Sequence, residues 1–227
     1  SAELPMSNVV ITGANRGIGL ALAQRFADRG DHVVAVCRES SDELDALGVR
    51  VESGIDVAAR ASLDELAGRL DDIDIDVLVN NAGVMRPSDL DAIEAQLDDF
   101  RLQFEVNSLA PLRVVSALSG RLARGAKVAI VTSRMGSIAD NETGGHYGYR
   151  MSKAAVNMAG RSLAVDLKPR GIAVGLLHPG YVRTGMTGHS GFCDPDEAAA
   201  GLVARIDELS PETSGGFRHA NGETLPW

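Results

Sequence analysis

The chain has 227 residues, of which 44% are hydrophobic and 23% are charged, enough to bury the core of one α/β domain. A formal net charge of −9 with dispersed arginines argues against nucleic-acid binding, which needs a concentrated basic face. The sequence lacks an apolar run of the roughly 18 residues that a membrane span requires. Its two cysteines lack metal-type or Cys-x-x-Cys spacing, which is typical of a reducing compartment, so we expect a cytoplasmic protein.

Short β-branched segments alternate with helical patterns along the chain. Strands are predicted at residues 8–12, 32–36, 49–52, 76–80, 127–132 and 172–178, and helices near 18–29, 60–70, 99–123, 149–168 and 195–209. Pro195 suits the first turn of the last helix, with Asp194 as its cap. Buried strands separated by helices predict right-handed crossovers and a parallel sheet. We therefore expect an α/β fold with a single-domain, Rossmann-type, doubly wound parallel sheet and helices on both faces. The domain is expected to span residues 7–227, with residues 1–6 as an expression remnant or a disordered N-terminus.

The first chemical signal is a glycine-rich turn in the segment VVITGANRGIGLALAQRF, residues 9–26. Glycine at the junction of a strand and a helix allows a tight turn and a close approach to a pyrophosphate, which then rests on free N–H groups of the helix. A single glycine-rich turn is also compatible with an ordinary strand-to-helix connection. Its position after the first strand favours a dinucleotide site. The turn residues predicted to hold the cofactor are Gly13, Asn15, Arg16, Gly17, Ile18 and Gly19.

An arginine at the end of the second strand and another in the glycine turn indicate which dinucleotide is bound. A carboxylate at that position bonds the 2′-hydroxyl of the ribose in NAD, whereas an arginine accepts the 2′-phosphate of NADP. The strand ends in VVAVCRES, which places Arg38 there, and Arg16 lies in the glycine turn. Two guanidinium groups on one phosphate would form a charge-assisted clamp. We expect NADP(H) to be preferred over NAD(H), although Glu39 leaves open that both arginines are solvated surface charges.

The segment GGHYGYRMSKAAV, residues 144–156, contains Tyr147, Tyr149 and Lys153. Residues four apart lie on one face of a helix, so Tyr149 faces Lys153 whereas Tyr147 faces Met151. A nearby ammonium favours the phenolate and lowers the phenol pKa from its usual value near 10. Tyr149 is therefore predicted to exchange a proton with an alcohol or a carbonyl. The alternative is a buried core tyrosine beside a solvated lysine.

Six motifs in this order resemble the short-chain dehydrogenase/reductase family: TGANRGIG, NNAG, VNS, VTS, YRMSK and HPGYVRT. The likeness covers residues 8 to about 190 and implies a nicotinamide-dependent oxidoreductase. The segments SRMGSI and GETLPW resemble the small C-factor and sniffer-type carbonyl reductases.

The resemblance implies a catalytic set of Asn107, Ser133, Tyr149 and Lys153. Ser133 follows a strand, where its hydroxyl is placed to stabilise a carbonyl oxygen that gains negative charge. It precedes Tyr149 by 16 residues, a longer gap than is usual in the family, which the surface segment DNETGGH can absorb. Ser137 is the alternative. Asn107 would hold a water for proton relay to the lysine, or would be only a polar residue that bends its helix.

Further cofactor contacts are carried over from the family. Lys153 would also bond the nicotinamide ribose. Pro179 fixes the direction of the chain, and Gly180 permits a close approach to a flat ring. Asp56 is alternatively a helix cap. Amides at the end of DVLVNNAGV are also suited to hold a neighbouring loop by hydrogen bonds. The positions transferred in this way are Asp56, Val57, Asn81, Gly83, Tyr149, Lys153, Pro179, Gly180, Val182 and Thr184.

The remaining signals concern metals, lids and partners. His146, His178 and His189 lack ligand spacing, so no metal is expected. Residues 185–194 are predicted to be either a mobile lid or a plain loop. The helices at 99–123 and 149–168 carry more apolar surface than one sheet contact uses. This excess favours a homodimer or a homotetramer, unless neighbouring helices of the same chain cover it.

Together these patterns predict an NADP(H)-dependent oxidoreductase that transfers hydride between C4 of the nicotinamide and a small carbonyl or secondary alcohol substrate. The alternative is a dinucleotide-binding regulatory or signalling protein with little turnover.

Overall fold

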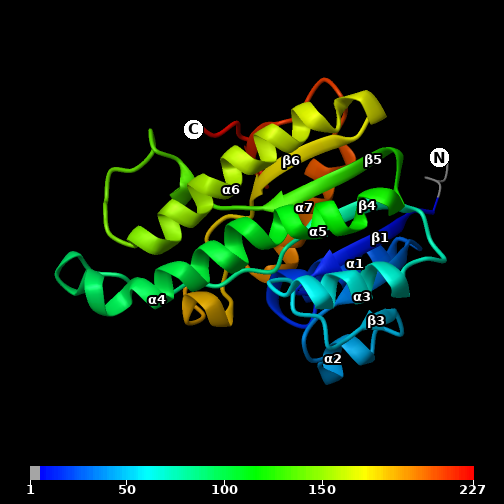
Figure 1. Ribbon diagram of the computed structural model, residues 1–227, viewed down its shortest axis with the longest axis horizontal. Coiled ribbons are helices and arrows are strands. Elements are labelled where there is room, and N and C mark those ends of the chain that lie inside the picture. The colour runs from blue at the N-terminus through cyan, green and yellow to red at the C-terminus, as the bar shows by residue number, and fades with distance from the viewer. Residues whose placement is uncertain (1–5) are drawn as a thin grey trace.

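A seven-stranded parallel sheet forms the centre of the computed structural model, which describes residues 6–227 (Figure 1). The strand order is β3-β2-β1-β4-β5-β6-β7. The strands are β1 (Asn8–Thr12), β2 (His32–Val36), β3 (Arg50–Glu52), β4 (Ile75–Asn80), β5 (Leu122–Val131), β6 (Ala173–His178) and β7 (Gly216–His219). The order reverses between β1 and β4, which is where parallel sheets of this kind bind ligands at the carboxyl ends of their strands.

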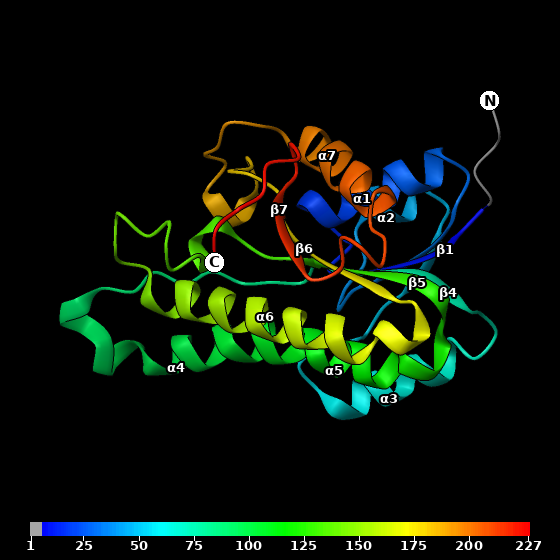
Figure 2. The same ribbon diagram turned by 90° about the horizontal axis from the view of Figure 1, so that it is seen from above.

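Helices cover both faces of the sheet, so the molecule has three layers (Figure 2). One face carries α3, α4, α5 and α6, and the other carries α1, α2 and α7 (Figure 2). The α-helices are α1 (Gly17–Asp28), α2 (Asp42–Asp45), α3 (Arg60–Arg69), α4 (Ile93–Phe104), α5 (Ala110–Leu118), α6 (Tyr147–Asp166) and α7 (Pro195–Asp207). A π-helical turn, η2 (Glu105–Leu109), joins α4 to α5. This arrangement confirms the expected Rossmann-type fold.

Alternate residues of the strands enter two separate cores. In β1, Val10 belongs to the cluster beneath α3, α5 and α6, whereas Val9 and Ile11 belong to the cluster beneath α1 and α7. Successive side chains of a strand point to opposite faces, and both faces of this sheet are covered. The continuous apolar runs of the sequence are therefore explained by burial on two sides.

The structure differs from the sequence expectations at several places, and the short helix α2 was not predicted. The helix predicted at 99–123 begins earlier, at Ile93, is interrupted by η2, and ends at Leu118, because residues 122–131 form β5. Strand β7 was not predicted. Asp194 occupies the position before α7, but its carboxylate accepts a hydrogen bond from Arg183 at 2.8 Å and does not cap the helix.

Residues 1–5 lie outside the described part of the chain, so the expected N-terminal remnant is described only at Met6. Over residues 6–227, the structure contains no helix with both the length and the apolar character needed to cross a membrane.

Candidate active site

The glycine turn between β1 and α1 has the backbone that was predicted for a phosphate cradle. Gly13 and Gly17 have φ angles of +65° and +54°, which favour glycine because other residues rarely adopt positive φ. A Cβ atom at Gly19 would overlap the carbonyl oxygen of Gly13. Within the described residues, no side chain caps the N-terminus of α1. Its free N–H groups and the positive end of the helix dipole therefore remain available to an anion.

The end of β4 holds this turn in place, as the amide-rich motif predicted. Nδ2 of Asn81 donates hydrogen bonds to the carbonyl oxygens of Thr12 and Gly13 at 3.2 and 3.1 Å. Oγ1 of Thr12 accepts the N–H groups of Asn81 and Ala82, both at 3.1 Å. The carboxyl ends of β1 and β4 are thus joined side by side at the point where the strand order reverses.

The two arginines predicted to select the cofactor are exposed beside the glycine turn. Arg16 lies directly before α1, and Arg38 lies two residues beyond the end of β2. Neither guanidinium group has a hydrogen-bond or ion-pair partner elsewhere in residues 6–227. Asp56 is also exposed, and its Oδ1 accepts the N–H of Ala58 at 2.9 Å in the turn before α3. One oxygen of Asp56 is therefore engaged in this turn, but Asp56 does not cap α3, whose N-cap position is occupied by Ala59.

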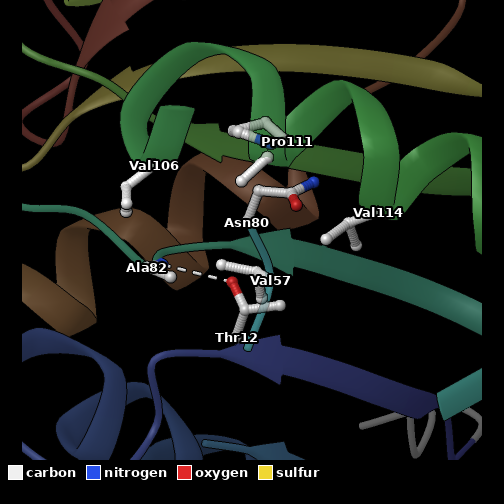
Figure 3. A pocket seen from close by; sticks show the side chains of 8 residues that line it. Thr12, Val57, Asn80, Ala82, Val106, Pro111 and Val114 are labelled. Atoms are coloured by element: carbon white, nitrogen blue, oxygen red, sulfur yellow. Dashed lines mark hydrogen bonds between the residues drawn. The ribbon is translucent and has the colours of Figure 1, made fainter. Parts of the chain in front are cut away.

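A narrow crevice without room for a water molecule lies at the ends of β1 and β4 (Figure 3). The side chains of Val57 and Asn80 face it (Figure 3). Nδ2 of Asn80 is buried and lacks a hydrogen-bond partner among the described residues. The full lining is Thr12, Val57, Asn80, Ala82, Val106, Ala110, Pro111 and Val114.

The segment after β6 returns to the glycine turn. The methyl group of Thr184 would lie 3.5 Å from a Cβ built on Gly17. Gly180 has a φ of +96°, and Pro179 and Val182 are buried.

Residues 185–194 form a loop with many internal hydrogen bonds. The N–H of Arg183 bonds the carbonyl of Cys193 at 3.0 Å, and the N–H of Phe192 bonds the carbonyl of Tyr181 at 2.7 Å. Arg183 also pairs with Asp194 at 2.8 Å. These bonds join the two ends of the loop.

Tyr149 lies in the first turn of α6 and is buried, and Ser133 is close enough to its hydroxyl to lower the pKa of the phenol. Ser133 directly precedes a 3₁₀ turn, Arg134–Gly136, and its Oγ accepts the N–H of Met135 at 3.1 Å. Ser137 is buried but its Oγ accepts the N–H of Asp140. Both hydroxyl oxygens therefore accept a backbone N–H in a turn, and of the two serines Ser133 is the one that acts on the pKa of the Tyr149 phenol. The extra residues between Ser133 and Tyr149 lie mainly in an exposed loop, residues 140–146.

Lys153 shares the buried face of α6 with Tyr149, as the spacing predicted. Its Nζ lies 5.8 Å from the centroid of the Tyr149 ring and donates a hydrogen bond to the carbonyl of Val131 at 3.1 Å. Burial lowers the pKa of Lys153 to about 8.

Burial raises the pKa of Tyr149 to about 12, with the hydrogen bond from Ser133 opposing the shift. The expected lowering of the phenol pKa is therefore wrong for the protein alone. Burial removes the water that stabilises a phenolate, and this cost outweighs the other effects.

Asn107 lies in the π-helical turn η2 and is buried. Its Oδ1 accepts the N–H of Val84 at 2.8 Å, and its Nδ2 donates to the carbonyl of Val84 at 2.8 Å. A Cβ at Gly83 would lie 3.3 Å from Oδ1 of Asn107 and 3.8 Å from Nζ of Lys153. Gly83 thus lies between the asparagine and the lysine, so its lack of a side chain matters to this part of the site.

Sequence reasoning missed three residues that shape this site. Thr12 ties the ends of β1 and β4 together. Gly136 lets the serine turn pack on α6, because a Cβ there would come within 2.7 Å of the Lys153 backbone. Ser152 contacts Asn107 from α6 at 3.0 Å. Thr12 and Ser152 lie inside the quoted motifs, so their positions were visible in the sequence but their partners were not.

The chain also matches known proteins. Residues 7–191 match the family described as short chain dehydrogenase. A 1-hydroxy-2-glutathionyl-2-methyl-3-butene dehydrogenase of Rhodococcus sp. (strain AD45) is 43% identical over 98% of this chain and 100% of its own length. The C-signal protein of Myxococcus xanthus is 48% identical over 67% of this chain and 93% of its own length.

Solved structures agree with the sequence comparison. The NADPH-bound carbonyl reductase from chicken fatty liver superposes with a TM-score of 0.89 at 30% identity, covering 99% of this chain and 100% of the other. The carbonyl reductase Sniffer of D. melanogaster has a TM-score of 0.89 at 29% identity, covering 98% and 100%. The resemblance to C-factor and sniffer-type proteins is confirmed, and the chain belongs to the short-chain dehydrogenase/reductase family of oxidoreductases.

Proposed function

We propose that the protein is an NADP(H)-dependent carbonyl reductase that converts a small carbonyl compound to an alcohol. The observation that carries this proposal is the buried group of Ser133, Tyr149 and Lys153, in which Ser133 acts on the pKa of the phenol and the amine lies 5.8 Å from the centre of the phenol ring. The fold presents the glycine turn and the segment after β6 next to each other. These parts fit a dinucleotide, since the glycine cradle leaves room and the helix N-terminus attracts phosphate.

Each residue of the site has a distinct task. The bound nicotinamide supplies or accepts the hydride. Ser133 orients the substrate oxygen and stabilises the negative charge that develops on it, and Tyr149 gives or takes the proton. Lys153 places a cation near the phenol, which favours the phenolate against the effect of burial. Asn107 supports proton relay towards Lys153 from the opposite side of Gly83.

The protonated state of the phenol suits carbonyl reduction. A Tyr149 pKa of about 12 keeps the hydroxyl protonated at neutral pH, so that it is ready to donate a proton to a developing alkoxide. This is the proton transfer required in carbonyl reduction. Oxidation of an alcohol needs the reverse transfer and gains from higher pH.

The preference for NADP(H) rests on Arg16 and Arg38, which flank the cradle without partners among the described residues. Two unpaired guanidinium groups can close on a 2′-phosphate at little cost to existing contacts. Asp56 and Val57 would meet the adenine, Asn81 its ribose, and Val182 and Thr184 the carboxamide of the nicotinamide. NADP(H)-bound carbonyl reductases among the similar structures support this choice.

The test is steady-state turnover of the wild-type protein with a panel of aldehydes, ketones and quinones, following NADPH and NADH absorbance. We expect NADPH oxidation with at least one carbonyl class and a lower KM for NADPH than for NADH. Tight NADPH binding without turnover of any carbonyl or alcohol would support a dinucleotide-binding regulator instead. A lower KM for NADH would overturn the cofactor preference.

We also propose that the chain forms a homo-oligomer through α6. Met151, Met158 and Val165 lie at seven-residue intervals on this helix and are 50%, 68% and 60% exposed. A stripe of large apolar side chains at this spacing is typical of helices that pack against a partner. Light scattering should give the mass of a dimer or a tetramer, and Met158→Glu should lower it. A wild-type monomer at micromolar concentration would contradict this part of the proposal.

A further inference from the structure

Two buried serines join the π-helical turn η2 to the helix that carries Tyr149 and Lys153. Ser152 in α6 has no exposed surface, and Ser108 in η2 is 4% exposed. Oγ of Ser108 donates a hydrogen bond to the carbonyl oxygen of Ser152 at 2.6 Å. Oγ of Ser152 accepts a hydrogen bond from Nδ2 of Asn107 at 3.0 Å. The two elements are therefore cross-linked by two side chains.

The hydroxyl of Ser152 has a fixed direction. It donates to the carbonyl oxygen of Tyr149 at 2.8 Å, one turn earlier in α6, and this leaves an oxygen lone pair for Asn107. Serines in helix interiors often make such a bond to their own helix, and this bond alone would have no further meaning. Here the same oxygen also receives the Asn107 amide, so the hydroxyl connects Asn107 to the backbone of the proposed catalytic tyrosine.

Asn107 depends on this contact for one of its two amide protons. The other proton bonds the carbonyl of Val84, and Oδ1 bonds the N–H of Val84. Val84 therefore sets which way the amide faces, and Ser152 sets how far the amide lies from α6. Without the Ser152 hydroxyl, a buried donor of Asn107 would lose its partner, and buried donors move to regain one.

We propose that Ser152, held by Ser108, is a positioning residue that fixes Asn107 relative to Tyr149 and Lys153. This inference rests on the proposed function, because Asn107 matters to turnover only if the site transfers protons. The residue acts through Asn107 and does not touch substrate or cofactor. Loss of the Ser152 hydroxyl should lower the rate of the chemical step and leave the affinity for the cofactor unchanged.

The test is a double-mutant cycle on kcat with NADPH and an accepted carbonyl. Ser152→Ala should lower kcat about tenfold, the usual effect of one coupled hydrogen bond, and should leave the Kd for NADPH within about twofold. In an Asn107→Ala background, Ser152→Ala should add less than about a twofold loss. Ser162→Ala is the matched control, since Ser162 lies on the exposed side of the same helix, and it should change neither quantity.

Losses that multiply in the double variant would overturn the inference, because Ser152 would then act independently of Asn107. An effect of Ser152→Ala no larger than that of Ser162→Ala would do the same. Both results require an active wild-type enzyme, whereas an inactive wild type counts against the proposed function.

A second measurement is independent of turnover: hydrogen exchange of the Asn107 side-chain amide, followed by NMR, should be faster in Ser152→Ala. Unchanged exchange would contradict the inference even in an inactive protein.

Discussion

Nζ of Lys153 lies 5.8 Å from the centroid of the Tyr149 ring, and both side chains are almost fully buried. Burial shifts the two groups in the same sense, towards their neutral forms: the pKa of the phenol rises to about 12 and that of the amine falls to about 8. Burial therefore disfavours the charged form of each group, the phenolate of Tyr149 and the ammonium of Lys153, relative to the same group in water. Such strain is common at sites where function requires a perturbed group.

A first prediction concerns stability. Lys153→Met should raise the melting temperature at pH 7, although it removes a residue of the proposed catalytic set, because the native protein then no longer buries an ammonium. Lys168→Met is the control, since Lys168 is exposed, and should change stability by no more than about 0.5 kcal/mol.

The pH dependence of this difference has a definite sign. Burial lowers the pKa of Lys153 from 10.5 to about 8, so between these values the unfolded chain binds more protons than the folded protein. Stability of the wild type then rises with pH. The advantage of Lys153→Met should be complete below pH 8 and should shrink between pH 8 and 10.5. A melting-temperature difference that stays constant over this range would contradict the shift.

The choice of serine leads to a second prediction. Ser133→Ala should lower kcat by roughly 10²–10³, the usual loss when one stabilising donor is removed from a developing oxyanion. Ser137→Ala should leave kcat close to that of the wild type, because Ser133, and not Ser137, acts on the pKa of the Tyr149 phenol. The reverse ranking in steady-state assays would assign the task to Ser137.

A pair of helical glycines provides the third prediction. Gly19→Ala should abolish NADPH binding and lower the melting temperature, because the new methyl group would overlap the carbonyl oxygen of Gly13. In α3, a Cβ at Gly68 meets nothing within 4 Å, so Gly68→Ala should preserve binding and stabilise the protein by about 0.5–1 kcal/mol. Retained NADPH binding in Gly19→Ala, measured by fluorescence titration, would contradict the cradle.

Cofactor choice is the subject of the fourth prediction. Arg38→Ala and Arg16→Ala should each weaken NADPH binding by about tenfold or more, as expected for a lost charge-assisted contact, and should change NADH binding little. Arg60→Ala is the control, because Arg60 is exposed on α3 and pairs with Asp64. Equal losses for both cofactors would show that the arginines do not read the 2′-phosphate.

The sequence predicted well those features that depend on local geometry. Tyr149 and Lys153 are four residues apart, and this spacing places them on the same face of a helix. The glycine turn was predictable because few residues other than glycine tolerate a positive φ. The π-helical turn at Asn107 escaped detection because the apolar pattern continues through it from α4 to α5. The strand β7, with sequence GFRH, has only four residues, and its pairing with β6 is set by the tertiary fold.

The direction of the Tyr149 pKa shift was also beyond the sequence. It depends on burial, and that burial is created by distant segments, including the serine turn that Gly136 allows to pack on the Lys153 backbone. Spacing shows that a cation is near a phenol. It does not show how much water remains around them.

The central claim is that Tyr149 performs proton transfer in this site. The most direct measurement is the rate of NADPH oxidation at saturating carbonyl by Tyr149→Phe, compared with Tyr147→Phe as the matched control two residues away on the same helix. The account predicts that Tyr149→Phe loses about 10²-fold or more in kcat while still binding NADPH, and that Tyr147→Phe keeps nearly full activity. Comparable activity of Tyr149→Phe and the wild type would contradict it.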